Sequence, residues 1–124
     1  MTFKVLVTGS RHLTDYQAVY DALDLVYREH IPLLVIHGAA RGADSFADVW
    51  AVSRDYVTPI RVPATNWAVE GPEAGISRNL QMLELHPDLV LAFFKNDAPN
   101  KGTAAMVKAA HAAGVPVIAY QELL

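Results

Sequence analysis

Five short apolar runs recur along the chain, and each is followed by a turn that contains glycine or polar residues. The runs cover residues 3–8, 33–37, 57–62, 88–94 and 115–119. Between them, apolar positions recur every three or four residues, which predicts helices that begin near residues 14, 42–45, 76 and 102. Near-continuous apolar strands that alternate with helices are typical of a parallel sheet with helices on both faces. The pattern therefore predicts an α/β fold with a doubly wound, five-stranded parallel sheet.

The order of the strands is limited because the crossover connections of such a sheet are right-handed. We expect the order 3-2-1-4-5, with the runs numbered along the chain. Pro59 interrupts the third run, and because proline cannot donate to a strand ladder, it predicts an edge strand. The chain changes direction between the first and fourth strands. Ligands of such sheets bind there, beyond the carboxyl ends of the strands.

Two of the predicted helices carry more specific signals. Residues Thr14 to Gln17 have the S/T-x-x-E/Q form of a capping box, which predicts that Thr14 caps the first helix. In the third helix, expected over residues 76–85, helical spacing predicts a stripe that faces the sheet. The members of this stripe are Ile76, Leu80 and Leu83.

The composition narrows the class of protein. A chain of 124 residues fits one domain, expected over residues 1–124, and its 52% apolar and 19% charged residues argue against disorder. The absence of cysteine excludes disulfides, thiol nucleophiles and zinc–thiolate sites, and suits a cytoplasmic protein. A net charge of −3 argues against a broad nucleic-acid surface, and no apolar run is long enough to span a membrane. The five histidines show no metal-binding spacing, so no metal site is expected.

Four segments at or near the predicted strand ends carry the candidate chemistry. Glycine in such turns allows a ligand to approach the backbone, and the free N–H groups of a helix start favour anions. None of the turns has the Walker pattern or the dinucleotide G-x-G-x-x-G pattern. The segments are Gly9-Ser10-Arg11, Gly38-Ala39-Ala40-Arg41-Gly42-Ala43-Asp44, Gly75-Ile76-Ser77-Arg78-Asn79, and the stretch from Lys95 to Asn100-Lys101-Gly102-Thr103.

Half of the ten basic residues fall at this one predicted edge of an acidic chain, which predicts a phosphate-bearing ligand. These residues are Arg11, Arg41, Arg78, Lys101 and, close by, Lys95. Other side chains have more than one reading. Asp44 either orients an arginine, accepts a hydrogen bond from a ribose hydroxyl, or caps its own helix. Asn79 is a candidate donor to a base or a phosphate. Trp67, on the long irregular segment, is either a lid residue that stacks on a base or a cover of the core.

Together these motifs resemble the YspA (cpYpsA-related) branch of the SLOG superfamily. The resemblance rests on Val5 to Arg11, His37 to Asp44, the Asn66-Trp67 loop, Ala74 to Asn79, and the stretch from Pro87 to Val90 that leads to Gly102-Thr103. It implies a Rossmann-like fold, a homodimer, and a nucleotide-type ligand such as AMP, ADP-ribose or an NAD-related compound. The ligand-binding residues it implies are Gly9, Ser10, Arg11, Gly38, Ala39, Arg41, Gly42, Ala43, Asp44, Arg78, Asn79, Lys101, Gly102 and Thr103.

The relatives in this superfamily leave the activity open. The resemblance implies binding of a nucleotide-derived ligand, in a sensor or a processing module. A second possibility is an enzyme of the Lonely Guy phosphoribohydrolase type, with Arg78 and Asp44 as catalytic residues and Asp44 as the only carboxylate nearby. In that family a glutamate follows the Gly-Thr pair by three residues, where this chain has Met106. A thioether cannot replace a carboxylate in that chemistry. A third possibility is single-stranded DNA binding like that of DprA.

Overall fold

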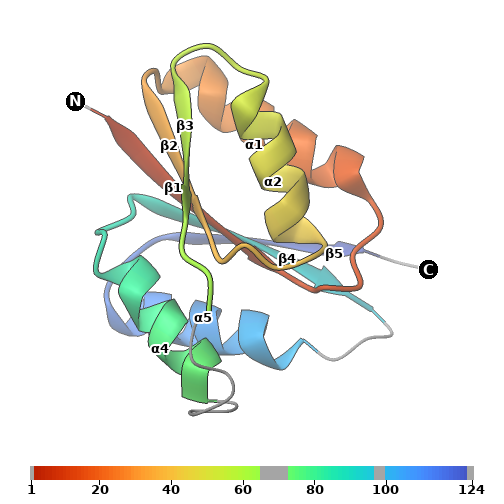
Figure 1. Ribbon diagram of the computed structural model, residues 1–124, viewed down its shortest axis with the longest axis vertical. Helices are drawn as coiled ribbons and strands as arrows, with labels where there is room; N and C mark the ends of the chain where they lie inside the picture. Colours follow the sequence, from red (N-terminus) through yellow and green to blue (C-terminus); the bar gives the residue numbers. More distant parts are fainter. Residues whose placement is uncertain (1, 65–72, 97–99, 123–124) are drawn as a thin grey trace.

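A five-stranded parallel sheet forms the centre of the molecule, and helices cover both of its faces (Figure 1). The computed structural model describes residues 2–64, 73–96 and 100–122. Each strand except the last is followed by a helix, as the alternation of apolar runs predicts. The elements are β1 (Phe3–Gly9), α1 (Tyr16–Glu29), β2 (Leu33–His37), α2 (Ala43–Val52), β3 (Val57–Arg61), α4 (Glu73–Leu83), β4 (Leu89–Lys95), α5 (Lys101–Ala112) and β5 (Val117–Glu122).

The strand order is β3-β2-β1-β4-β5, and all four pairings are parallel. The predicted fold class and strand order are therefore confirmed. The central strand β1 is fully buried from Val5 to Val7, which explains its unbroken apolar sequence. Pro59 lies in the edge strand β3, opposite Val35 of β2, so the prediction from its missing N–H is also confirmed.

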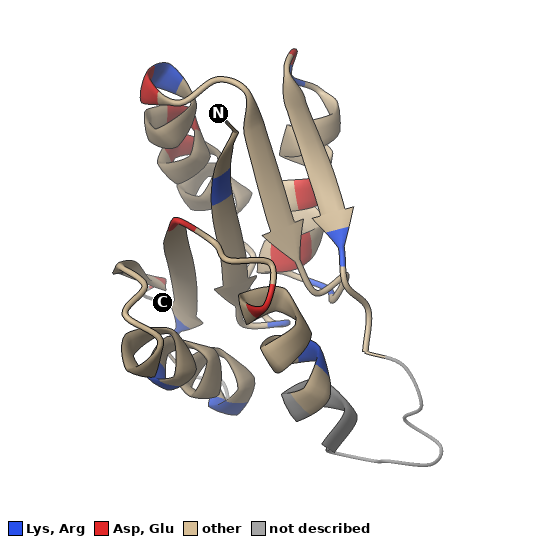
Figure 2. Ribbon diagram, turned by 90° about the vertical axis from the view of Figure 1, so that its left-hand side faces the viewer, with Lys and Arg blue, Asp and Glu red and all other residues tan. Residues whose placement is uncertain are grey.

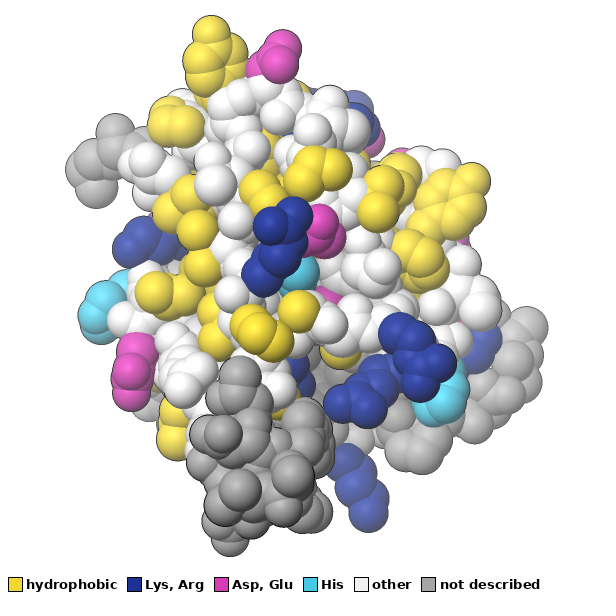
Figure 3. Space-filling model, viewed as in Figure 1, with side chains coloured by type: hydrophobic (Ala, Val, Ile, Leu, Met, Phe, Trp, Pro, Cys, Tyr) yellow, Lys and Arg dark blue, Asp and Glu magenta, His cyan; other side chains and the backbone are white. Residues whose placement is uncertain are grey.

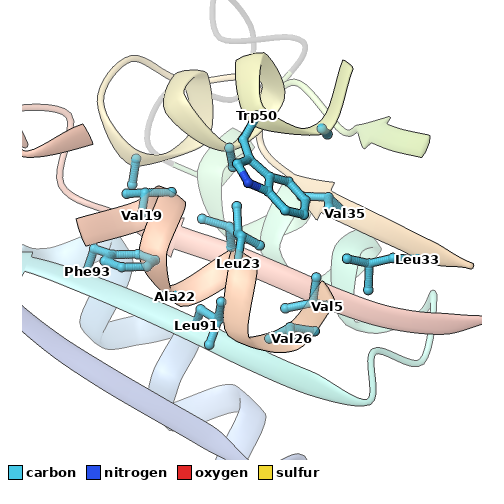
Figure 4. Close-up of a cluster of buried hydrophobic side chains, with 14 of the residues drawn as sticks. Val5, Val19, Ala22, Leu23, Val26, Leu33, Val35, Trp50, Leu91 and Phe93 are labelled. Carbon is cyan, nitrogen blue, oxygen red and sulfur yellow. The ribbon is translucent and has the colours of Figure 1, made fainter. Parts of the chain in front are cut away.

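Side chains of β1 alternate between two hydrophobic cores, one on each face of the sheet. Val5 and Val7 pack on the face that α1 and α2 cover, around the fully buried Trp50 (Figure 4). The indole Nε1 of Trp50 donates to Asp24 of α1 at 2.9 Å, so the largest core side chain also joins the two helices. Leu6 points to the opposite face, where it packs with residues of α4 and α5. The buried members of this second core are Leu6, Ile36, Met82, Val90, Met106 and Ala110.

The first helix begins differently from the capping-box prediction. Asp15, not Thr14, is the N-cap of α1, and its carboxylate accepts the N–H of Ala18 at 3.1 Å. The amide and hydroxyl of Thr14 instead donate to Glu122 at the end of β5. Thr14 is therefore held by a contact that is distant in sequence, and the local pattern did not reveal it.

The inner face of α4 also differs from its prediction. The helix begins at Glu73, three positions before the expected start. Leu80 is 52% exposed, whereas Met82 is 2% exposed and Leu83 packs against the second core. The expectation for Leu80 is therefore wrong because the buried stripe of the helix runs through Met82 and Leu83. Trp67 and the side chain of Ile76 lie outside the described residues.

In the part of the chain that the structure describes, no helix is both long enough and apolar enough to cross a membrane.

Candidate functional site

The loops after β1 and β2 pack closely against each other at the carboxyl edge of the sheet. Gly42 has φ of +74°, and a Cβ there would lie 2.2 Å from the carbonyl oxygen of Ser10. A Cβ on Gly9 would lie 2.5 Å from the Cβ of Ala43, at the start of α2. Both glycines are therefore required by the approach of one loop to the other. The structure brings the Gly9–Arg11 and Gly38–Asp44 segments together, as their positions after neighbouring strands predict.

Asp44 is 5% exposed and holds the loop that precedes its own helix. Its Oδ2 accepts the N–H of Gly38 at 2.9 Å and the N–H of Ala40 at 3.3 Å. The N-cap of α2 is Gly42, and no side chain caps this helix start. The expectation that Asp44 caps its own helix is therefore wrong, because its carboxylate turns back to the amides of the loop.

Burial raises the pKa of Asp44 above its ordinary value, because an ionised carboxylate is poorly solvated there. Nearby His37 and Arg78, together with the amides of Ala40 and Gly38, favour the ionised form and oppose this effect. The net direction is upward. A buried acid with a raised pKa is common in functional sites.

Arg78 of α4 reaches across to the same loop. Its Nη1 donates to the carbonyl oxygen of Gly38 at 2.7 Å, and its Nε donates to the Oδ1 of Asn79 at 3.2 Å. Burial lowers the pKa of Arg78, and the positive charge of Arg11 lowers it further, while the charge of Asp44 acts in the opposite direction. The Arg78 guanidinium is thus held near the buried carboxyl group of Asp44, and the exposed Arg11 lies near enough for its charge to act on Arg78.

A second network, which the sequence analysis did not identify, fixes the end of β2. The Nδ1 of His37 accepts the N–H of Ala39 at 3.0 Å, so its Nε2 is the protonated nitrogen and donates to Asp48 at 2.6 Å. Asp48 also accepts two hydrogen bonds from Arg61, from Nε at 2.6 Å and from Nη2 at 3.0 Å. Arg61 is the register partner of His37 across β2 and β3. The alignment of the ends of β2 and β3 was the signal that could have shown that Arg61 lies beside His37.

Asp48 changes the expectation that Asp44 is the only carboxylate near the site. Asp48 lies one helical turn after Asp44 on α2, and its Oδ2 contacts His37, whose neighbouring residue Gly38 is bound by Asp44. The hydrogen bonds to Arg61 and His37 outweigh the effect of partial burial and lower the pKa of Asp48. Asp48 is thus an ionised, hydrogen-bonded carboxylate, in contrast to Asp44.

Lys95 lies at the carboxyl end of β4, where its charge is paired. Its Nζ forms an ion pair with Glu122 at the end of β5, and its backbone is bound by the side chain of Asn100. Glu122 in turn accepts hydrogen bonds from the amides of Thr14 and Asp15. The pair therefore joins the end of the sheet to the entry of α1, and it balances the charge of Lys95 at this edge.

Lys101, Gly102 and Thr103 form the first turn of α5, which no side chain caps. A Cβ on Gly102 would meet no atom within 4 Å, so Gly102 faces open space, whereas Thr103 is buried. This helix start shares the carboxyl edge of the sheet with the Asp44 and Arg78 groups but, among the described residues, forms no hydrogen bond with them. Arg11 and Arg41 are exposed at the same edge.

The positions of charged residues agree with this description. Figure 2 shows Lys and Arg residues near the strand arrowheads, at about mid-height in the view, and on the helices below them. Figure 3 shows Lys and Arg side chains gathered beside a histidine in its lower right part. Among the described residues, no group of three or more His, Asp or Glu side chains is arranged to hold a metal ion.

Comparison with known proteins identifies the family of this arrangement. The sequence model of the YAcAr family, described as the YspA, cpYpsA-related SLOG family, matches residues 3–68. The chain belongs to this family. The match includes both glycine-containing loops and the network of His37, Asp48 and Arg61. The SLOG resemblance of the sequence is thereby confirmed.

The SLOG chain is also similar to a phage protein. It is 40% identical over 120 residues to the Gene 61 protein of Mycobacterium phage D29. The aligned region covers 93% of this chain and 94% of the phage protein. No solved structure matches the chain. The likeness therefore extends over nearly the whole SLOG chain, including α4 and α5.

The position of Met106 in this SLOG protein bears on the Lonely Guy type of chemistry. Met106 is 0% exposed and packs in the second core beside Leu6 and Met82. Its side chain thus lies between α5 and the sheet, and not at the carboxyl edge near Asp44. At the position where the Lonely Guy motif has a glutamate, this chain therefore has a buried core residue and no acid.

Proposed function

We propose that this SLOG protein binds a nucleotide or a nucleotide-derived phosphate ligand at the carboxyl edge of its sheet, as a sensor or a processing module. The observation that carries the proposal is the pair formed by Arg78, which is bound to the carbonyl of Gly38, and Arg11, whose backbone lies beside Gly42 of the same loop. The positive charge of Arg11 acts on Arg78, which is itself partly buried and tied to the loop. Two cations held together are unfavourable unless an anion is shared between them, and arginine is well suited to bind phosphate.

The start of α2 supports the same ligand class. No side chain caps this helix, whose first residue is Ala43, so its free N–H groups are directed toward the carboxyl edge. The amides of Gly38 and Ala40 are not available, because Asp44 binds both. A phosphate at this edge would therefore use the helix start together with Arg11 and Arg78.

Mononucleotides and their derivatives have the matching chemistry, because each combines a phosphate with hydroxyl and base groups. AMP, ADP-ribose and NAD-related compounds are the candidates that we favour. Asn79 adds a further polar group, since its Oδ1 accepts from Arg78 and its amide NH₂ then points elsewhere. This arrangement favours a ligand with polar groups beyond its phosphate.

Thermal unfolding in the presence of AMP, ADP-ribose, NAD, cyclic nucleotides and inorganic phosphate tests the proposal. A ligand at 100 times its Kd stabilises the folded state by about 2.7 kcal/mol, which raises the unfolding midpoint clearly. We expect at least one nucleotide to do so, and Arg78→Ala to remove the effect. Arg28→Ala is the matched control, because Arg28 lies in the last turn of α1, far from this edge, and its loss removes the same charge. Failure of every compound to shift the wild-type midpoint would overturn the proposal.

A further inference from the structure

One peptide unit in the loop after β2 is held by a side chain at each of its ends. The carbonyl of Gly38 and the N–H of Ala39 belong to this peptide, which is planar and moves as one rigid piece. The carbonyl accepts from the Nη1 of Arg78 at 2.7 Å, and the N–H donates to the Nδ1 of His37 at 3.0 Å. A rotation of the peptide that takes the N–H away from His37 therefore also turns the carbonyl away from Arg78.

The imidazole ring of His37 has a fixed orientation. The residue is 2% exposed, and its Nε2 donates to Asp48 at 2.6 Å. Asp48 is itself held by two hydrogen bonds from Arg61. Because Asp48 binds Nε2, the ring keeps its Nδ1 directed at the N–H of Ala39. The neutral ring with its proton on Nε2 satisfies both contacts.

Protonation of His37 would remove the acceptor that Ala39 uses. Both nitrogens of an imidazolium are donors, so the Nδ1–H and the N–H of Ala39 would face each other where the two nitrogens are 3.0 Å apart. Ala39 also has φ of +57°, a backbone conformation that is unfavourable for alanine. Loss of the hydrogen bond therefore leaves a strained peptide opposite a charged donor, and rotation of the peptide relieves both.

The charged groups around His37 come from three elements, and the carboxyl half of β1 beside it contains no charged residue. Asp44 and Asp48 of α2 both interact with the charge of His37. Arg61 of β3 is its register partner, and Arg78 of α4 is bound to the next residue. Burial raises the pKa of Asp44, so Asp44 is a second group beside this loop whose charge can change in acid. A test of His37 must therefore separate the two.

We propose that His37 is a positioning residue of the site, which holds Arg78 through the Gly38–Ala39 peptide only while its ring is neutral. When the ring is protonated, the peptide turns and the guanidinium loses the orientation in which it binds an anion. The site thus binds its anion at neutral pH and releases it as the pH falls through the range from about 8 to 5, in which histidine takes up a proton. This consequence rests on the proposed function, whereas the coupling of His37 to Arg78 does not.

NMR spectroscopy of the ligand-free wild-type protein between about pH 8 and pH 5 tests the coupling. The ¹⁵N signals of an imidazole distinguish a bare ring nitrogen from a protonated one. We expect the Nδ1 of His37 to be bare at the upper limit and protonated at the lower one. The amide signal of Ala39 and the Nε signal of Arg78 should change with the same midpoint. A ring that titrates without a change at Arg78, or that keeps its Nδ1 bare throughout, would overturn the proposal.

Calorimetric titration with ADP-ribose measures the consequence for binding. Its phosphates, unlike that of AMP, lack the proton that a phosphate monoester loses at about pH 6, so the charge of the probe stays constant. We expect the wild-type protein to bind ADP-ribose about ten-fold more weakly at the lower pH limit, which corresponds to the loss of one hydrogen bond to a charged group.

His37→Asn separates the histidine from Asp44. Asparagine places an oxygen close to the position of Nδ1 and does not titrate, so this variant should bind ADP-ribose equally well at both pH limits. Asp44 is unchanged in it, and a pH dependence that persists would assign the effect to Asp44 and overturn the proposal. His111→Asn removes an exposed histidine in the last turn of α5 and is the matched control, which should keep the wild-type dependence.

The two measurements distinguish this inference from the proposed function. If ADP-ribose binds equally well at both pH limits while the ring of His37 titrates, this inference is overturned and nucleotide binding stands. If neither ADP-ribose nor any other nucleotide binds, the proposed function fails, and the NMR titration still decides whether His37 controls Arg78. Both decisive measurements use the wild-type protein, so they hold even if His37→Asn does not fold.

Discussion

The guanidinium of Arg78 lies directly against the α-carbon of Gly38. A Cβ at this position would lie 2.2 Å from Nη1 and 2.7 Å from Cζ, and no nearer neighbour than Arg78 restricts it. Glycine is therefore needed at residue 38 because the Arg78 side chain of α4 occupies the space that a Cβ would take. It is not needed to permit a strained backbone conformation. The nearest atoms belong to the end of a flexible side chain, so a substitution there would displace Arg78 before it disturbs the fold.

Gly38→Ala is therefore expected to abolish ligand binding with little loss of stability. The alanine displaces the guanidinium and breaks its 2.7 Å bond to the carbonyl of residue 38. The loss of that bond and the reduced freedom of the unfolded chain partly cancel, so the free energy of unfolding should change by about 1 kcal/mol or less. Urea unfolding and titration with ADP-ribose measure the two effects. Arg78→Ala should weaken binding to the same degree, and unimpaired binding by Gly38→Ala would contradict the role of the guanidinium.

Gly42→Ala should have the opposite profile and destabilise the fold strongly. Its φ of +74° is strained for alanine, and the new Cβ would lie 2.2 Å from the backbone oxygen of Ser10, which cannot move aside alone. We expect a loss of about 2 kcal/mol or more in urea unfolding. Gly102→Ala provides the comparison, because its Cβ would enter open space in a helix. That change should leave stability unaltered or raise it by up to about 1 kcal/mol. A similar loss in both variants would refute the argument.

Asp44→Asn is expected to stabilise the unliganded protein at neutral pH. Burial raises the pKa of Asp44, so the folded state binds its proton more tightly than the unfolded state does. Such a group contributes stability below its ordinary pKa, and this contribution is lost as the pH rises through the raised value. Asparagine keeps an acceptor for Gly38 and Ala40 but carries no charge. In urea unfolding, the free energy of unfolding of the variant should therefore increase relative to that of the wild type as the pH rises from 3 to 7. An advantage that is the same at every pH would contradict this account.

Glu122→Gln should show the reverse dependence on pH. Burial alone would raise the pKa of Glu122, but hydrogen bonds from Lys95 and from the amides of Asp15 and Thr14 lower it overall. The stabilisation is therefore present above the ordinary pKa of a glutamate and is lost as the pH falls through the lowered value. At pH 7 we expect Glu122→Gln to lose about 2 kcal/mol, a typical value for hydrogen bonds to a charged group. The two proteins should become equally stable in acid, and a deficit that persists there would point to packing instead.

The fold was predictable from the sequence because its signals are local and repeated. Apolar runs marked the strands, and the fixed hand of the crossovers limited their order. Pro59 marked an edge through a single missing N–H. The candidate site was predictable only in part. That Gly38, Asp44 and Arg78 lie at one edge follows from the order of the elements, whereas the contacts between them do not.

The contacts that sequence reasoning missed join residues far apart in the chain. Thr14 and Glu122 are 108 positions apart, and their hydrogen bond overrides a good local capping signal. The ion pair of Lys95 was missed because its partner, Glu122, lies on another strand. Such pairs depend on the register of strand ends, which a pattern of apolar residues does not specify. Asp48 and Arg61 escaped notice for the same reason.

Met106→Glu separates ligand binding from Lonely Guy chemistry. The change restores the acid that the phosphoribohydrolase motif has at this position, yet Met106 is fully buried in the second core beside Leu6 and Met82. A carboxylate there has no positive partner among its described core neighbours, so we expect a loss of about 3 kcal/mol or more in urea unfolding. We expect the release of adenine from AMP, measured by chromatography, to stay at the uncatalysed level with both the wild type and Met106→Glu. Adenine release by the variant would show that residue 106 can reach the ligand, and would contradict its assignment to the core.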